Sequence, residues 1–412
     1  MHVRYANAIR IPVILYLAAC TGSPDETGHS FRIYEEDGVT IAETTGGPKY
    51  EGEIFSYEPV VTLRQDPQDE ESLIYYARYM TMDSEGNYYV VDGSAYRIVV
   101  FDQAGEYVRS FGRRGSGPGE YQWMTVVDFD GEIFQIWDSN NRRLNRVHRD
   151  GTFLGSQPPP GNMRVARMRA LRDNRLIVWF SRNEGREGFA YTSGVNYVMS
   201  SAGDTLATVV TDEIITGYHR LISGPGGRSG YQQGSIPFVS YPCMEYIPER
   251  GFMVTTGMTP EVLWYDLSGE HKQTFRLDMA PRRVTPEIRQ AYEESWLRGE
   301  RERAEQSGRE PRSMPEQVYP EIAAIWYGGF VDDAGYVWLQ ILQLPGGEES
   351  GEWSRFFILD PEGCYLGYAR LPNRQTTIVN GHMLAAITDP ETGEVDLTVF
   401  TITPIPRGLR YP

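Results

Sequence analysis

The chain has 412 residues, of which 40 % are hydrophobic and 12 % aromatic, and its formal net charge at pH 7 is −17. This hydrophobic content excludes a largely disordered chain, and the acidic surface disfavours nucleic-acid binding because it repels phosphate backbones. The 43 glycines and 26 prolines, together with few long amphipathic helical patterns, favour an all-β protein rich in turns.

The first 19 residues have the pattern of a secretory signal. Two arginines precede an apolar segment, residues 11–19, which is too short to span a membrane. The segment ends in Leu-Ala-Ala-Cys at Cys20, which resembles the lipobox of bacterial lipoproteins. The resemblance implies that residues 1–19 are removed and that Cys20 carries a lipid anchor; an ordinary signal peptide with a chance cysteine is the alternative. Thr21 follows instead of Asp, which by analogy with enteric bacteria favours the outer membrane.

Residues 20–56 are expected to form a lipid-anchored linker. Within it, "FRIYEEDGVTIAE" (31–43) predicts a small hairpin around Asp37-Gly38, which either docks on the folded domain or spaces it from the membrane. A single strand then follows in "PVVTLRQD" (59–66), with no adjacent strand in sequence to pair with.

The next part of the chain repeats itself. "DGSAYRIVVFDQAGEYVRS" (92–110) overlays "DSNNRRLNRVHRDGTFLGS" (138–156) at a constant offset. Apolar and polar residues alternate in short runs separated by turn residues, as expected for antiparallel strands. A glycine between two strands recurs along the chain at Gly105, Gly151, Gly203, Gly269 and Gly363.

A repeat of roughly 40–55 residues with three or four short strands is the signature of a β-propeller blade. Five turn glycines and a final hairpin (382–403) predict six blades over residues 57–412. The last unit lacks an outer strand, so we expect strand 59–66 to pair with it and close the ring.

The pattern of Asp, Arg-Ile, Phe-Asp and Gly-Pro-Gly-Glu-Tyr over residues 92–121 resembles the NHL repeat. The segment from about residue 57 to the end resembles the six-bladed NHL-type propeller lipoproteins of bacteria, closely in two blades and in outline thereafter. Related propellers include peptidyl-hydroxyglycine lyases, which hold zinc, and gluconolactonase-like enzymes, which hold a divalent ion. Neither ligand set can be placed on this sequence.

The glycine-rich stretch "SFGRRGSGPGEYQ" (110–122) raises the question of a phosphate-binding loop. A strand follows it where a phosphate loop requires a helix, and Pro118 removes one N–H donor. We therefore interpret it as the crossing between blades 1 and 2. Arg113 and Arg114 are either solvated or paired with nearby acids; the alternative is that they contact a ligand at the propeller face.

Three further features are candidates for function. His219 lies in a glycine-rich segment (217–236), which we expect to be a loop at a binding face. The polar insertion 281–320, between blades 4 and 5, predicts a helix capped by Thr285. Trp296 lies on its apolar face and either packs on the propeller or belongs to a lid or partner-binding element.

Two cysteines follow Cys20, namely Cys243 and Cys364, and their spacing neither supports nor forbids a disulfide. No cofactor is predicted, although calcium or zinc would accompany an enzymatic role. The sequence favours a cell-envelope module that binds a ligand, or a protein, peptide or glycan partner. The alternative is a metal-dependent hydrolase or lyase acting at the channel mouth.

Overall fold

The computed structural model describes residues 28–161, 165–186, 189–211, 213–223, 229–345, 353–372, 376–388 and 395–411. The expected signal segment, 1–19, and Cys20 lie outside these residues. No helix within the described ranges is both long and apolar enough to cross a membrane.

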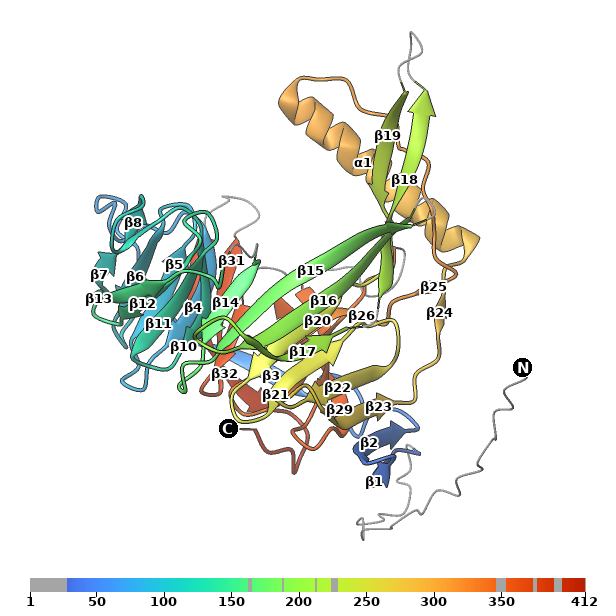
Figure 1. Cartoon of the computed structure of the whole chain (residues 1–412), viewed down its shortest axis with the longest axis horizontal. Helices are drawn as coiled ribbons and strands as arrows, with labels where there is room; N and C mark the ends of the chain where they lie inside the picture. Colours follow the sequence, from blue (N-terminus) through green and yellow to red (C-terminus); the bar gives the residue numbers. More distant parts are fainter. Residues whose placement is uncertain are drawn as a thin grey trace, which may run out of the picture.

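The chain forms a six-bladed β-propeller, as predicted (Figure 1). Each blade contains four antiparallel strands that follow one another from the channel outwards. Blade 1 consists of β4 (Ala77–Met82), β5 (Tyr88–Asp92), β6 (Arg97–Phe101) and β7 (Tyr107–Phe111). Blade 2 consists of β10 (Met124–Phe129), β11 (Ile133–Asp138), β12 (Arg143–His148) and β13 (Phe153–Gln157). Blade 3 consists of β14 (Arg167–Ala170), β15 (Leu176–Arg186), β16 (Phe189–Met199) and β17 (Thr205–Val210).

The remaining blades have the same order. Blade 4 consists of β20 (Cys243–Ile247), β21 (Gly251–Thr255), β22 (Glu261–Tyr265) and β23 (His271–Leu277). Blade 5 consists of β26 (Trp326–Val331), β27 (Val337–Ile341), β28 (Trp353–Leu359) and β29 (Tyr365–Pro372). Blade 6 consists of β30 (Thr376–Val379), β31 (His382–Thr388), β32 (Val395–Pro404) and β3 (Phe55–Thr62).

The recurring glycines occupy one equivalent position, the turn between the third and fourth strands of blades 1 to 5. Each has a positive φ and donates its N–H to the carbonyl three residues earlier, and a register shift follows in the paired strands. This is a hairpin with a bulge, in which glycine avoids the strain that other residues meet at positive φ. The regular spacing of the repeat therefore reflects one turn geometry used five times.

The ring is closed by the N-terminal strand, which confirms the predicted arrangement. β3 pairs antiparallel with β32, with Phe55 opposite Pro404 and Thr62 opposite Thr398. Phe55 is 1 % exposed, and its ring lies 5.5 Å from that of Trp338 and 4.7 Å from that of Tyr411. The first and last strands of the propeller thus share one blade, and their pairing joins the two ends of the ring.

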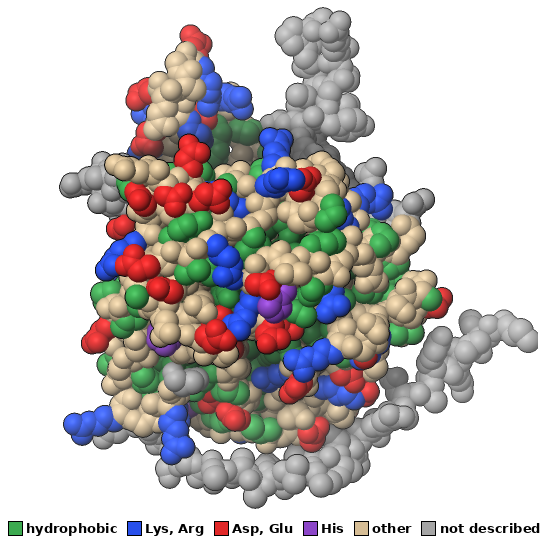
Figure 2. Space-filling view, turned by 90° about the vertical axis from the view of Figure 1, so that its left-hand side faces the viewer, with side chains coloured by type: hydrophobic (Ala, Val, Ile, Leu, Met, Phe, Trp, Pro, Cys, Tyr) green, Lys and Arg blue, Asp and Glu red, His purple; other side chains and the backbone are tan. Residues whose placement is uncertain are grey.

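The core lies between neighbouring blades, because each sheet buries both faces against the next. Phe134 and Ile136 of blade 2 pack with Tyr89 and Val91 of blade 1, and the same layering recurs around the ring. On the outside, acidic and basic side chains are interspersed with hydrophobic ones over the face at the left of Figure 1 (Figure 2).

The repeated Asp and Arg of blades 1 and 2 hold the loops that enter each blade. Asp92 and Arg97 are opposite one another in the strand register, as are Asp138 and Arg143. The buried aspartates accept N–H groups of the loop before β4 and of the loop before β10. The arginines donate to carbonyls of the same two loops rather than to the aspartates, so both side chains of each repeat hold the loop backbone.

Two segments project from the ring (Figure 1). The first is a hairpin of β18 (Ile214–Ser223) and β19 (Ser229–Ser235), in which β18 pairs with the first residues of β16. The expectation of a loop is therefore wrong for 217–223 and 229–235, because these strands extend the sheet of blade 3. The second is α1 (Pro286–Ser307), the helical insertion predicted between blades 4 and 5.

Helix α1 begins as expected, with the Thr285 side chain accepting the N–H of Ile288. Its first turns pack through Ile288 and Tyr292 on Phe238 and neighbouring apolar residues. Its C-terminal end is held by Glu300, which is 4 % exposed. The Oε1 of Glu300 accepts a hydrogen bond from Arg309 Nη1 at 2.6 Å. Short strands β24 (Arg282–Arg283) and β25 (Ile322–Ala323) pair at its base.

The N-terminal segment also joins the ring. β1 (Ser30–Glu36) and β2 (Val39–Thr45) form a hairpin around Asp37 and Gly38. β2 pairs in parallel with β23, so the hairpin extends blade 4 outwards. His29, just before β1, places its Nε2 3.7 Å from the Cys364 Sγ.

Candidate functional site

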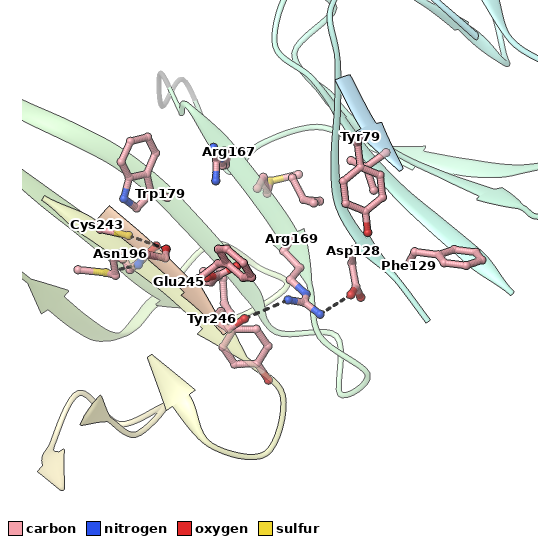
Figure 3. Close-up of a pocket in the computed structure, with 17 residues that line it drawn as sticks. Tyr79, Asp128, Phe129, Arg167, Arg169, Trp179, Asn196, Cys243, Glu245 and Tyr246 are labelled. Atoms are coloured by element: carbon pink, nitrogen blue, oxygen red, sulfur yellow. Dashed lines mark hydrogen bonds and ion pairs between the residues drawn. The ribbon is translucent and has the colours of Figure 1, made fainter. Parts of the chain in front are cut away.

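A cavity of about 510 Å³ lies in the central channel. It is lined mainly by the inner strands β4, β10, β14, β20 and β26, which come from five different blades, so the ring itself creates it. Its size is within the range of small-molecule sites, roughly 300–1,000 Å³. The side chains labelled around it in Figure 3 are Tyr79, Asp128, Phe129, Arg167, Arg169, Trp179, Asn196, Cys243, Glu245 and Tyr246.

Arg169 is fixed across the channel. Its Nη2 forms an ion pair with Asp128 of β10, and its Nη1 donates to the carbonyl of Tyr246 on β20 at 3.4 Å (Figure 3). Its guanidinium carbon also lies 4.8 Å from the centre of the Tyr246 ring. Burial raises the pKa of Asp128, while the Arg169 charge opposes that shift. Blades 2, 3 and 4 are thereby joined by one charged side chain.

Arg167 precedes it by two residues on the same strand and has a different environment. Its side chain is exposed to the cavity, and its guanidinium carbon lies 5.9 Å from the Trp179 ring centre. Among the described residues, Arg167 forms no ion pair and its side chain makes no hydrogen bond. A guanidinium supported by an aromatic ring and lacking a carboxylate partner is available to bind an anion.

Glu245 contributes a carboxyl group from β20. The backbone N–H of Val331 and the charges of Arg167 and Arg169 favour its ionised form, without a direct ion pair between described residues. Desolvation outweighs these favourable effects and raises the pKa of Glu245 to about 7. A carboxyl with a strongly shifted pKa inside a cavity is a common feature of functional sites.

Cys243 lies on the same strand as Glu245. Its Sγ donates to the Gly329 carbonyl at 3.3 Å, and burial raises the pKa of its thiol to about 11. Cys243 and Cys364 are both free thiols, so the two do not form a disulfide in this structure. Since the thiolate is the reactive form, the raised pKa makes Cys243 a weak nucleophile.

Exposed aromatic side chains stand where inner strands begin. Tyr76 precedes β4 and Trp123 precedes β10, and the Arg78 guanidinium carbon lies 5.9 Å and 4.2 Å from their ring centres. Tyr241 and Tyr327 are similarly exposed near the starts of β20 and β26. These residues place aromatic surface near one end of the channel.

Arg113 and Arg114 lie in the crossing between blades 1 and 2, as β8 (Arg113–Arg114), which pairs in parallel with β9 (Glu120–Tyr121). Arg113 Nη2 forms an ion pair with Glu120 at 2.7 Å, and the Arg114 guanidinium carbon lies 5.7 Å from the Tyr96 ring centre.

The N–H groups of Ser116 and Gly117 in this crossing both donate to Glu120 Oε2, at 3.0 and 2.8 Å. The donors that a phosphate would need are therefore occupied by a carboxylate of the chain itself.

The other two predicted residues lie on the projecting segments. His219 is in β18, opposite Gln233, and its side chain lies outside the described part of the chain. Trp296 is partly buried on α1, beyond the turns that pack through Ile288 and Tyr292. Arg113, Arg114 and Trp296, the predicted site residues whose side chains are described, do not line the channel cavity. A ligand- or partner-binding role for these four residues stays a prediction.

Sequence reasoning missed the channel residues Arg167, Arg169 and Glu245. They lie in blades 3 and 4, where the Asp and Arg of the repeat are absent and the strand register could not be read. One signal was present in "RMRA", which proves to be an inner strand: the two arginines alternate there with the apolar residues Met168 and Ala170. Charge on a strand next to the axis of a propeller must face the channel or pair across it.

The described residues contain no group of three or more His, Cys, Asp or Glu side chains that could hold a metal ion. The expected alternatives of calcium or zinc therefore have no identified ligand set in this part of the chain.

A family model described as a 6-bladed β-propeller matches residues 69–218, which agrees with the observed fold. No curated protein matches the chain.

Solved structures resemble it at low identity. A protein of Bacteroides fragilis described as exported is 13 % identical, covers 86 % of this chain and 98 % of its own, and has a TM-score of 0.49. Virginiamycin B lyase from Staphylococcus aureus is 10 % identical over 84 % of this chain and 99 % of its own, with a TM-score of 0.37. A calcium-binding regucalcin from Agrobacterium tumefaciens is 12 % identical, covers 85 % of this chain and 95 % of its own, and has a TM-score of 0.37. These similarities are too distant to carry a functional argument.

Proposed function

We propose that this protein is a lipid-anchored module of the bacterial cell envelope that binds a small ligand in its central channel. The observation that supports binding is the channel cavity of about 510 Å³, in which charged and aromatic side chains from separate blades converge. A concave site with a few convergent polar groups and a carboxyl of shifted pKa is the usual form of a ligand site. The lipobox-like sequence at Cys20 supports the anchor.

Ligand binding is tested with the unlipidated chain, residues 21–412, in a screen of neutral, cationic and anionic small molecules. Trp179 lines the cavity, whereas Trp123 is 46 % exposed and does not line it. A ligand in the channel should raise the melting temperature and change tryptophan fluorescence in wild type and in Trp123→Phe. The fluorescence change should be lost or much reduced in Trp179→Phe. A response that Trp179→Phe retains in full would place the ligand elsewhere, and no response to any compound would count against the proposal.

The anchor is tested separately in cells. The wild-type chain should incorporate labelled fatty acid and sediment with outer membranes, and Cys20→Ala should do neither. Release of wild-type protein as a soluble species with no lipid would refute the anchor and leave channel binding untouched.

The metal-dependent hydrolase or lyase expected as the alternative stays a prediction. Metal content of the purified chain before and after chelation tests it, because a tightly held transition metal would demand a ligand set beyond those described.

A further inference from the structure

The charges around the channel cavity do not balance. Arg169 is paired with Asp128, so these two groups neutralise one another. Arg167 faces the same cavity, and no described carboxylate pairs with it. One positive charge therefore remains in the lumen before Glu245 is considered.

Glu245 decides the net charge of the cavity near neutral pH. The groups that face it are Arg167 and Arg169 from β14 and the Cys243 thiol from its own strand. Tyr79 and Tyr246 line the same cavity, and burial raises the pKa of both phenols, so they stay neutral together with the thiol. Since the Glu245 carboxyl titrates near pH 7, much of it is protonated at neutral pH and the lumen then carries one net positive charge.

Arg167 and Glu245 offer complementary hydrogen-bonding groups on neighbouring inner strands. A guanidinium presents paired N–H donors that match a carboxylate. A protonated carboxyl adds one O–H donor. Figure 3 shows the two side chains around the same space, with the aromatic rings of Trp179 and Tyr246 beside them.

Building on the proposed channel binding, we infer that the ligand is a small organic carboxylate, which Arg167 binds through its guanidinium and Glu245 through its protonated carboxyl. The aromatic side chains pack against the apolar body of the ligand. When Glu245 is ionised, its negative charge repels the ligand carboxylate unless Glu245 takes up a proton as the ligand binds. Binding is therefore coupled to uptake of a proton at Glu245.

The test uses benzoate as the carboxylate, benzamide as its neutral analogue and glycine as a zwitterion. Calorimetry of the 21–412 chain is expected to show binding of benzoate and not of benzamide. The affinity should fall about tenfold for each pH unit above 7, because one proton is taken up with each ligand. At pH 8, the binding enthalpy should differ between two buffers of different ionisation enthalpy, because the buffer supplies the proton that Glu245 takes up.

Variants assign the two roles. Arg167→Gln should weaken benzoate binding at pH 6 by at least about tenfold, since it removes a charge-assisted bidentate contact. Glu245→Gln should keep binding and abolish its decline above pH 7, because an amide donates a hydrogen bond at every pH. Arg146→Gln, at an exposed arginine on β12, is the matched control and should bind as wild type does.

Each contrary result has a distinct meaning. Benzamide binding as tightly as benzoate, or benzoate affinity that does not change from pH 6 to pH 8, overturns the inference. If glycine binds more tightly than benzoate and its binding releases a proton, ionised Glu245 binds the ammonium group of the ligand, and the inference is also overturned. If only neutral or cationic compounds give a Trp179-dependent response, this inference fails while channel binding stands; if no compound does, both fail.

Discussion

Glu245 makes a specific prediction for the pH dependence of stability. Its pKa is about 7 in the folded protein and close to the ordinary value of 4.5 in the unfolded chain. Between these values the folded state binds a proton that the unfolded state has released, so stability must fall as pH rises through this window. A difference of about 2.5 pKa units corresponds to about 3 kcal/mol, fully expressed above pH 7 and absent below pH 4.5.

Glu245→Gln removes this titration while keeping the shape of the side chain. The free energy of unfolding, measured by urea titration at pH 5, 6, 7 and 8, should fall from pH 5 to pH 8 by about 2.5 kcal/mol more in wild type than in the variant. Other carboxyls of raised pKa, such as that of Asp128, are common to both proteins and cancel in the comparison. Parallel curves for the two proteins across this range would refute the assignment of a carboxyl in the channel whose desolvation is only partly offset by Arg167 and Arg169.

Three further changes test the closure of the ring and the attachment of the helix. Phe55→Ala should lower the free energy of unfolding by about 3–5 kcal/mol, because a fully buried ring is lost from the closing strand; a loss below about 1 kcal/mol would mean that this contact is not essential. Gly105→Ala should destabilise the protein by at least about 1 kcal/mol more than Gly131→Ala. Both glycines have positive φ, but a Cβ at Gly105 would lie 2.3 Å from the Thr62 carbonyl oxygen and one at Gly131 would meet nothing within 4 Å; equal losses would contradict that close contact. Glu300→Gln should speed tryptic cleavage after α1, measured by mass spectrometry, because its carboxylate holds the following chain; an unchanged cleavage rate would show that other contacts hold this segment.

The blade count and the ring closure could be predicted because both depend on local features. The sequence itself shows a glycine in the turn between the third and fourth strands of blades 1 to 5. It also shows a strand before the first blade that has no adjacent strand in sequence to pair with. The start of α1 was equally readable, since Thr285 and Pro286 form a cap that requires no tertiary contact.

The channel site could not be predicted because its members meet only when the ring forms. Arg167 and Glu245 are 78 positions apart in numbering, on strands whose repeat is weak, and Asp128 comes from a third blade. The hairpin β18–β19 was also missed, because its glycines indicate a loop when the continuation of a neighbouring strand is unknown. Long-range pairing overrides local preference in both cases.

The pairing of β3 with β32 also dictates when the propeller can be completed. Ser56 and Thr403, which are opposite one another in this pair, are separated by 347 positions, so nearly the whole chain must be synthesised before they can meet. Until then the sixth blade lacks a strand and the ring has an open seam. Pairings over such separations form slowly. A nascent chain of this protein would therefore remain incompletely folded until nearly all of it has been synthesised.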